Sequence, residues 1–329
     1  MSGDMSSPFS VSNSIASVSG DLAPQDAAWF RKIMSDCILC PRACHADRLD
    51  GGVGYCGQTA DIMAARASLH YWEEPCISGT SGSGTVFFSG CNLRCVFCQN
   101  HNIALGKAGR VITPEHLVKI FLQLQEQGAN NINLVTPTHF LPQIVIALEQ
   151  AKQQGLHLPI VYNTSSYESP EALHHLEGLV DIYLPDLKYF SPELSTAYSH
   201  APDYFETACA AISEMYRQVG DPVIDEDTGL MQHGMIVRHL LLPGQTKDSK
   251  KILRYLHETY GDHIYISIMN QYTPLPQVAD IEALNRTVTP EEYDRVLRFA
   301  ERIGIEQGFR KEGSSACESF IPEFDERGL

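Results

Sequence analysis

Three closely spaced cysteines are the residues of this sequence best suited to metal chemistry. Cys91, Cys95 and Cys98 occupy eight positions within the stretch SGCNLRCVFCQN. Thiolates bind soft metals, chiefly zinc and iron–sulfur clusters. A structural zinc site closes with four ligands, and using His101 as the fourth would make the spacing too tight for the usual zinc patterns. We therefore favour a four-iron cluster held by three thiolates, in which one iron has no protein ligand.

Four further cysteines precede this loop and suffice for a second metal site. Cys37, Cys40, Cys44 and Cys56 lie within 20 residues of one another. In a long chain without a visible secretory signal, such crowding indicates metal ligation rather than disulfides. The four cysteines could bind either zinc or a second iron–sulfur cluster. Zinc would hold together a short loop-rich segment, whereas a cluster would suit electron supply or substrate contact.

An alternation of strand-like and helical stretches, starting at Thr85, must position these residues. Short continuous apolar runs are typical of strands buried on both faces, and they cover 85–89, 132–136, 158–163, 180–184, 235–243 and 263–269. Helical periodicity or helix start signals follow at 114–127, 140–155, 169–178, 202–219, 248–260 and 290–303. Six β–α units without a Gly-x-Gly-x-x-Gly after the first strand predict an α/β fold, a partial (β/α)6 TIM-like barrel.

Polar residues gather at the ends of the predicted strands, where TIM-type barrels place their active sites. They are Thr136, Thr138 and His139 after the second strand, Asn163 and Thr164 at the third, Asp186 and Lys188 after the fourth, Arg238 and His239 within the fifth, and Asn270 and Gln271 after the sixth. This repetition predicts a shared site. Glu73 and Glu74 precede a glycine-rich run, and we interpret them as either cluster-site residues or a solvated loop.

The cysteine loop, with Phe97 just before its third cysteine, resembles the signature of the radical S-adenosylmethionine (radical SAM) enzymes. The stretches NINLVTPTH, LPIVYNTSSYE, DIYLPDLKYF and VRHLLLPG resemble a branch related to the activating enzyme of pyruvate formate-lyase. The resemblance implies a [4Fe–4S] cluster whose open iron is chelated by S-adenosylmethionine. It also implies reductive cleavage of this cofactor to a 5′-deoxyadenosyl radical, which abstracts hydrogen.

By the same resemblance, Asp186, Lys188 and Arg238 would line the S-adenosylmethionine pocket, and Asn163 and Thr164 would meet its ribose. Asp and Asn can accept hydrogen bonds from ribose hydroxyls, and Lys or Arg can pair the methionyl carboxylate.

The sequence departs from the superfamily after the second strand, where a Gly-Gly-Glu-like motif often holds the methionyl amino group. Thr136 and Thr138 stand there instead, and their hydroxyls offer less charge complementarity.

Three functions follow from these patterns. The first is a radical SAM oxidoreductase that activates a glycyl-radical enzyme, and the second is modification of a small molecule or peptide by the same chemistry. Either enzyme would need a low-potential electron donor of the flavodoxin or ferredoxin type. A third, non-enzymatic reading is a zinc-stapled binding module.

Composition limits the partners and the location. The chain has 329 residues and a net charge of −16, which argues against binding to nucleic acid or anionic membranes. No apolar run approaches the roughly 20 residues of a membrane helix, and we expect a cytoplasmic protein. The expected organisation is a disordered tail at 1–25, a cysteine-rich segment at 26–84, the barrel at 85–310 and a C-terminal tail at 311–329.

Overall fold

The computed structural model describes residues 24–310 and 323–329. Residues 1–23 of the predicted disordered tail and most of the predicted C-terminal tail at 311–329 therefore lie outside the described residues, as does Cys317, whereas residues 24 and 25 of the predicted tail begin a helix.

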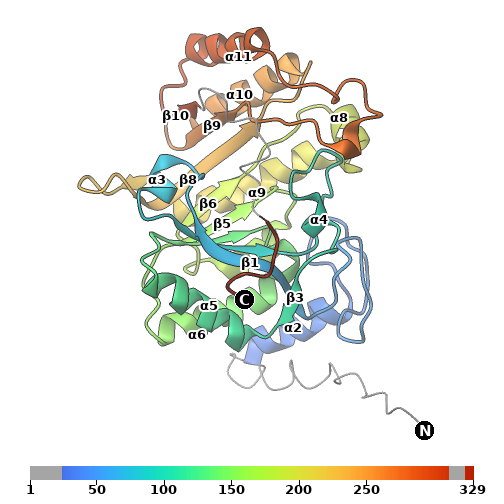
Figure 1. The fold of residues 1–329 in the computed structure, drawn as a ribbon, viewed down its shortest axis with the longest axis vertical. Helices are drawn as coiled ribbons and strands as arrows, with labels where there is room; N and C mark the ends of the chain where they lie inside the picture. The colour runs from blue at the N-terminus through green and yellow to red at the C-terminus, as the bar shows by residue number, and fades with distance from the viewer. Residues whose placement is uncertain (1–23, 311–322) are drawn as a thin grey trace.

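A mostly parallel, ten-stranded sheet forms the centre of the molecule (Figure 1). Its six predicted strands are β2 (Ser83–Phe88), β4 (Ile132–Val135), β5 (Ile160–Thr164), β6 (Ile182–Pro185), β8 (Met231–Leu240) and β9 (Tyr265–Met269). They pair in parallel and in the order in which they occur in the chain. In the part of the chain that the structure describes, hydrogen bonds do not close this sheet on itself. The prediction of a partial TIM-like barrel is thus confirmed, in an open form.

The predicted helices lie between these strands. They are α5 (Pro114–Glu126), α6 (Leu141–Gln153), α7 (Pro170–Leu173) continued by the 3-10 turn η2 (His174–Leu176), α9 (Tyr204–Val219), α10 (Thr246–Tyr260) and α11 (Pro290–Ile303). Helix α11 begins with the predicted capping box, in which Thr289 and Glu292 satisfy each other's backbone N–H groups. Figure 1 shows α5 and α6 side by side at one end of the sheet and α10 with α11 at the other.

Several elements were not predicted. They are α2 (Pro24–Ser35), β1 (Ile62–His70), α3 (Pro75–Ser78), α4 (His101–Ala104), β3 (Arg110–Ile112), α8 (Pro192–Ser199), β7 (Val223–Ile224) and β10 (Gly308–Arg310). Strand β1 pairs antiparallel with β2 and β3, so residues before Thr85 extend the sheet. Its sequence, IMAARASLH, is rich in alanine, which is a poor strand former.

The C-terminal end of the chain returns to β1. The Glu326 N–H donates to the Ala65 carbonyl at 3.1 Å, and the Arg327 carbonyl accepts from the Ala67 N–H at 2.9 Å. Figure 1 shows the terminus lying along this strand. Strand β1 is therefore covered on a side that would otherwise expose unpaired backbone groups.

The main apolar core lies where the helices pack on the sheet. Leu117 and Phe121 of α5, Leu134 of β4 and Ile144 of α6 are all fully buried in it. No helix among residues 24–310 and 323–329 is long and apolar enough to cross a membrane.

Candidate active site

The cysteine loop begins where β2 ends, and its entry is fixed by backbone contacts. His139 is buried, and its Nε2 lies 2.6 Å from the Ser89 carbonyl. Burial lowers the pKa of His139 to about 3, so the neutral imidazole donates this bond. Gly90 follows with φ of +91°, a conformation that favours glycine. The histidine after β4 thus positions the strand end from which the loop departs.

The three thiols of the loop lie within electrostatic reach of one another. The Cys91 sulfur accepts from the Leu93 N–H at 3.4 Å and from the Arg94 N–H at 3.5 Å, and the Cys95 sulfur accepts from the Ser199 hydroxyl at 3.1 Å. Burial raises the pKa of Cys98 to about 12, and the Cys95 and Cys91 thiols contribute. Ionising such a group of thiols requires a compensating cation, which a bound metal supplies.

Aromatic rings hold the loop against the barrel. Phe97 meets the rings of Tyr189, Tyr198 and Tyr272 edge-on, with centroid distances of 6.0 to 6.4 Å. Such edge-to-face packing is a preferred aromatic geometry. The residue that precedes the third cysteine is therefore an anchor.

The end of β9 also reaches the loop. The Gln99 side chain donates to the Gln271 carbonyl at 3.2 Å, and Gln277 donates to the Cys98 carbonyl at 3.1 Å. Of the predicted polar residues after the sixth strand, Gln271 thus contacts the cysteine loop through its carbonyl, while the contact to the third cysteine comes from Gln277, which was not predicted.

Four of the predicted site residues form one charged network. Lys188 Nζ lies 2.6 Å from Asp186 Oδ2, and Arg238 Nε lies 3.3 Å from Asp186 Oδ1. The Arg238 guanidinium also donates to Asn163 Oδ1, and its Nη1 lies 3.0 Å from Glu73 Oε2. The residues that end β5, follow β6 and interrupt β8 therefore meet, as their positions at strand ends predict.

This network places a cation next to the cysteine loop. Burial alone would raise the pKa of Asp186, but Lys188 and Arg238 hold it below its ordinary value. Burial alone would lower the pKa of Lys188, but Asp186 and the Cys95 thiol raise it. Both side chains are therefore charged, and Lys188 faces the thiols.

Two predicted threonines belong to a separate buried cluster. The hydroxyls of Thr138 and Thr164 both donate to Glu168 Oε1, the former at 2.6 Å, and Tyr162 reaches the same oxygen at 3.4 Å. Glu168 is 1% exposed, and burial raises its pKa to about 7. The sequence offered no signal for this role, because Glu168 directly precedes the Ser-Pro start of α7 and resembles a helix-capping residue.

Thr136 is joined to the first network by its backbone. Its N–H donates to the Asn163 carbonyl at 2.9 Å, and its φ of +57° is unusual for a β-branched residue. Its side chain is half-buried. The turn after β4 is therefore held tightly against the end of β5.

Glu74 is buried and Glu73 is half-buried, which contradicts the interpretation of a solvated loop. Glu73 pairs with Arg238 and accepts from the Asn133 side chain at 3.1 Å. Glu74 is 1% exposed, and its Oε2 has no hydrogen-bond partner among the described residues. The segment between β1 and α3 thus places the carboxylates of Glu73 and Glu74 inside the molecule. The Glu73 carboxylate meets polar side chains of the sheet.

The four N-terminal cysteines also lie together. Cys37 and Cys56 are buried, and Cys40 and Cys44 are half-buried. Burial raises the pKa of Cys40 to about 12, with further contributions from the Cys56 and Cys37 thiols. All nine cysteines in the described residues are free of disulfides. Among those residues, no three His, Cys, Asp or Glu side chains converge as ligands of a metal ion, either here or in the Cys91 loop.

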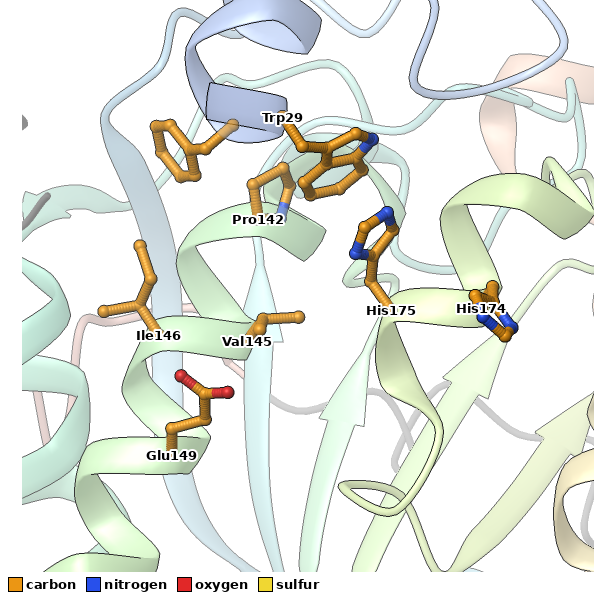
Figure 2. Close-up of a pocket in the computed structure, with 8 residues that line it drawn as sticks. Trp29, Pro142, Val145, Ile146, Glu149, His174 and His175 are labelled. Carbon is orange, nitrogen blue, oxygen red and sulfur yellow. The ribbon is translucent and has the colours of Figure 1, made fainter. Parts of the chain in front are cut away.

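A separate pocket of about 330 Å³ lies between α2, α6 and η2 (Figure 2). In it, Trp29 stacks on His175 with ring centroids 3.7 Å apart, above the turn of α6 that carries Pro142 and Val145. None of its lining residues belongs to the predicted site. This pocket is therefore distinct from the cysteine loop and its charged network.

Comparisons with known proteins agree with these features. A family model described as "Radical SAM superfamily" matches residues 85–256, more than half of the chain. An uncharacterised protein of Methanocaldococcus jannaschii is 27% identical over 286 residues, covering 84% of this chain and 77% of that protein. A pyruvate formate-lyase-activating enzyme of Clostridium pasteurianum is 30% identical over 121 residues, 34% of this chain and 48% of that enzyme. The structure of Streptococcus suis SuiB bound to its precursor peptide SuiA matches with a TM-score of 0.46 and 12% identity, covering 69% of this chain and 47% of that one.

Proposed function

This chain belongs to the radical SAM superfamily, and we propose that it activates a partner enzyme by abstracting a hydrogen atom from a glycine of that enzyme. The observation that carries this proposal is the meeting of the cysteine loop with the Asp186–Lys188–Arg238 network at the ends of the strands. The partial relationship to a pyruvate formate-lyase-activating enzyme supports the choice of a glycyl-radical partner.

The donor set fits a [4Fe–4S] cluster. Three soft thiols come from one short loop, and Cys thiolates are the usual ligands of iron–sulfur clusters. Two backbone N–H groups point at the Cys91 sulfur, and the Ser199 hydroxyl points at the Cys95 sulfur. Hydrogen bonds of this kind stabilise anionic sulfur and tune the potential of a cluster.

The charged network suits S-adenosylmethionine. Lys188 lies beside the thiols, where its ammonium can pair the methionyl carboxylate. Asp186 and Asn163 offer acceptor oxygens for hydroxyl or amino groups of the cofactor. In this structure Lys188 pairs with Asp186, and Asn163 accepts from Arg238, so cofactor binding would exchange these internal contacts for contacts to the ligand.

The chemistry itself belongs to the cofactors. When bound, the cluster and S-adenosylmethionine would supply reductive cleavage of S-adenosylmethionine and hydrogen abstraction from the substrate, with one electron from a low-potential donor of the flavodoxin or ferredoxin type. The residues of the chain hold the cofactor and fix its orientation. Phe97 and the three tyrosines around it pack the base of the loop and limit the access of water.

The experiment uses protein, peptide and small-molecule fractions from the source cells grown on glycine deuterated at Cα. The anaerobic, reduced protein is incubated with S-adenosylmethionine and each fraction, and the mass of the 5′-deoxyadenosine is measured. We expect deuterium transfer only with a protein fraction, together with a glycyl radical detected by electron paramagnetic resonance.

A Lys188→Met variant should lose this transfer, because it removes the cation beside the thiols. Lys152→Met is the matched control. Lys152 lies on α6, away from the site, and its ammonium donates to the Gly178 carbonyl at 3.0 Å. Deuterium transfer only with a small-molecule or peptide fraction would overturn the activase proposal in favour of modification of such a substrate.

A further inference from the structure

We propose that Cys37, Cys40, Cys44 and Cys56 hold a second iron–sulfur cluster, placed directly against the Cys91 loop. Four thiols suffice to ligate a closed cluster without an open iron. The proposal stands independently of the substrate and of S-adenosylmethionine cleavage, because it concerns a different set of ligands.

The spacing of the cysteines favours a cluster over zinc. Cys37-x2-Cys40-x3-Cys44 places three thiols in eight positions, and Cys91-x3-Cys95-x2-Cys98 does the same with the two gaps reversed. The fourth thiol, Cys56, comes from a separate turn. Structural zinc sites usually take their ligands as two pairs, whereas three clustered cysteines and a distant fourth are typical of iron–sulfur ligation.

The backbone curls tightly around the first three thiols. The Ala43 N–H donates to the Cys40 carbonyl at 3.0 Å, and the His45 N–H donates to the Cys37 carbonyl at 3.0 Å. Ala43 and His45 both have positive φ, of 39° and 55°. Such conformations are costly for residues other than glycine and persist only where the surroundings enforce them. A bound cluster would hold the loop in these backbone conformations.

The turn that carries Cys56 closes on this loop. A Cβ added to Gly54 would lie 2.7 Å from the Cys44 sulfur, so only glycine allows the approach. The N–H of Tyr55 donates to the same sulfur at 3.2 Å. Cys56 is buried and lies within electrostatic range of the Cys37 and Cys44 thiols.

A buried arginine indicates that these thiols carry negative charge in the working protein. Arg48 is 1% exposed, and its Nη1 lies 4.0 Å from the Cys37 sulfur. Its other hydrogen bonds go to the Thr59 carbonyl, and within the described ranges it forms no ion pair with a carboxylate. A buried cation is costly unless an anion compensates it. Metal-bound thiolates provide that anion, whereas neutral thiols do not.

The proposed site lies directly beside the Cys91 loop. A Cβ on Gly90 would lie 2.9 Å from the Cys56 carbonyl oxygen, and one on Gly57 would lie 2.7 Å from Arg94 Nη2. Arg42 Nε donates to the carbonyl of Asn92, the residue after Cys91, at 2.8 Å. The segment that carries the four N-terminal cysteines therefore packs directly on the Cys91 loop.

The test counts metal and sulfide in the full-length protein purified without oxygen. Two four-iron clusters predict about eight iron and about eight sulfide per chain, without zinc. Changing Cys37, Cys40 and Cys44 together to serine should leave about four iron. Changing Cys91, Cys95 and Cys98 together should also leave about four iron, bound to the N-terminal site. Cys209→Ser is the matched control, because this half-buried thiol lies in α9 outside both groups, and it should leave the iron content unchanged.

Three results would overturn the proposal: one zinc with about four iron in the wild type, about four iron without zinc, or loss of all iron in the Cys91–Cys95–Cys98 variant. Circular dichroism and size-exclusion chromatography establish that each variant is folded. Mössbauer spectra of the ⁵⁷Fe-labelled wild type count the clusters without any substitution. Iron lost only with the N-terminal cysteines and unaffected by changes at Cys91, Cys95 and Cys98 would instead refute the proposed active site.

Discussion

Glu168 offers a quantitative test of the buried cluster beside the active site. Its Oε1 accepts from the hydroxyls of Thr138, Thr164 and Tyr162, while its Oε2 has no hydrogen-bond partner among the described residues. Changing Glu168→Gln keeps the shape and the accepting oxygen but removes the ionisable proton. The variant therefore isolates the cost of ionising this carboxyl.

The magnitude follows from the pKa of Glu168, which burial raises from 4.5 to about 7. The unfolded chain loses this proton near pH 4.5, whereas the folded protein keeps it to about pH 7. The unfolded state then binds fewer protons, so stability falls as pH rises through this window. With about 1.4 kcal/mol for each unit of pKa difference, the loss is about 1 kcal/mol at pH 5 and about 3 kcal/mol at pH 8.

The assay is urea unfolding of the anaerobic protein, followed by circular dichroism at about pH 5 and about pH 8. Relative to Glu168→Gln, the wild type should lose about 2 kcal/mol of unfolding free energy between the two conditions. Glu171→Gln, three residues further along, is the control. Its carboxyl is exposed and accepts from Ser169, so the variant should follow the pH dependence of the wild type.

Equal pH dependence in the wild type and Glu168→Gln would refute the reasoning. It would mean that the carboxyl ionises at its ordinary pKa, and that water or a rearranged hydrogen bond compensates its burial. A wild type that gains stability relative to the variant as pH rises would reverse the sign and contradict the burial argument directly.

Two further substitutions test the network and the loop. Arg238→Met removes the cation that pairs with Glu73 and one of the two cations that pair with Asp186, and it should lower the unfolding free energy by about 3–5 kcal/mol, measured by urea unfolding. The exposed Arg217→Met should change it little, and equal losses in the two variants would contradict the network. Ser199→Ala removes the hydroxyl that donates to the Cys95 sulfur and should make the reduction potential of the cluster more negative, measured by redox titration. Ser195→Ala, on the same helix but bonded to a backbone carbonyl, should leave the potential unchanged, and an unchanged potential in Ser199→Ala would show that this bond does not reach the cluster.

The fold was predictable where single stretches carry the signal. Continuous apolar runs such as INLV of β4 belong to strands buried on both faces, and the capping box at Thr289 marks the start of α11. Strand β1 has no such signal, because its alanine-rich sequence forms a strand through pairing with its neighbours in the sheet. The contact of the C-terminus with β1 joins residues that are far apart in sequence, and no local pattern reports it.

The same distinction applies to the site. The proximity of the charged side chains of Asp186, Lys188 and Arg238 was predictable, because parallel strands bring their carboxyl ends to one edge of the sheet. Glu168 was not, because its role depends on burial by the surrounding chain. Glu73 is a similar case: its partner, Arg238, is 165 positions away.

We propose that the Cys91 loop holds the cluster that cleaves S-adenosylmethionine. The most direct test incubates the dithionite-reduced protein with S-adenosylmethionine and measures 5′-deoxyadenosine by liquid chromatography with mass detection. We expect product from the wild type and from Cys209→Ser, and none from a folded Cys95→Ala protein. Undiminished product from Cys95→Ala, or a colourless wild type that contains zinc and forms no product, would contradict it.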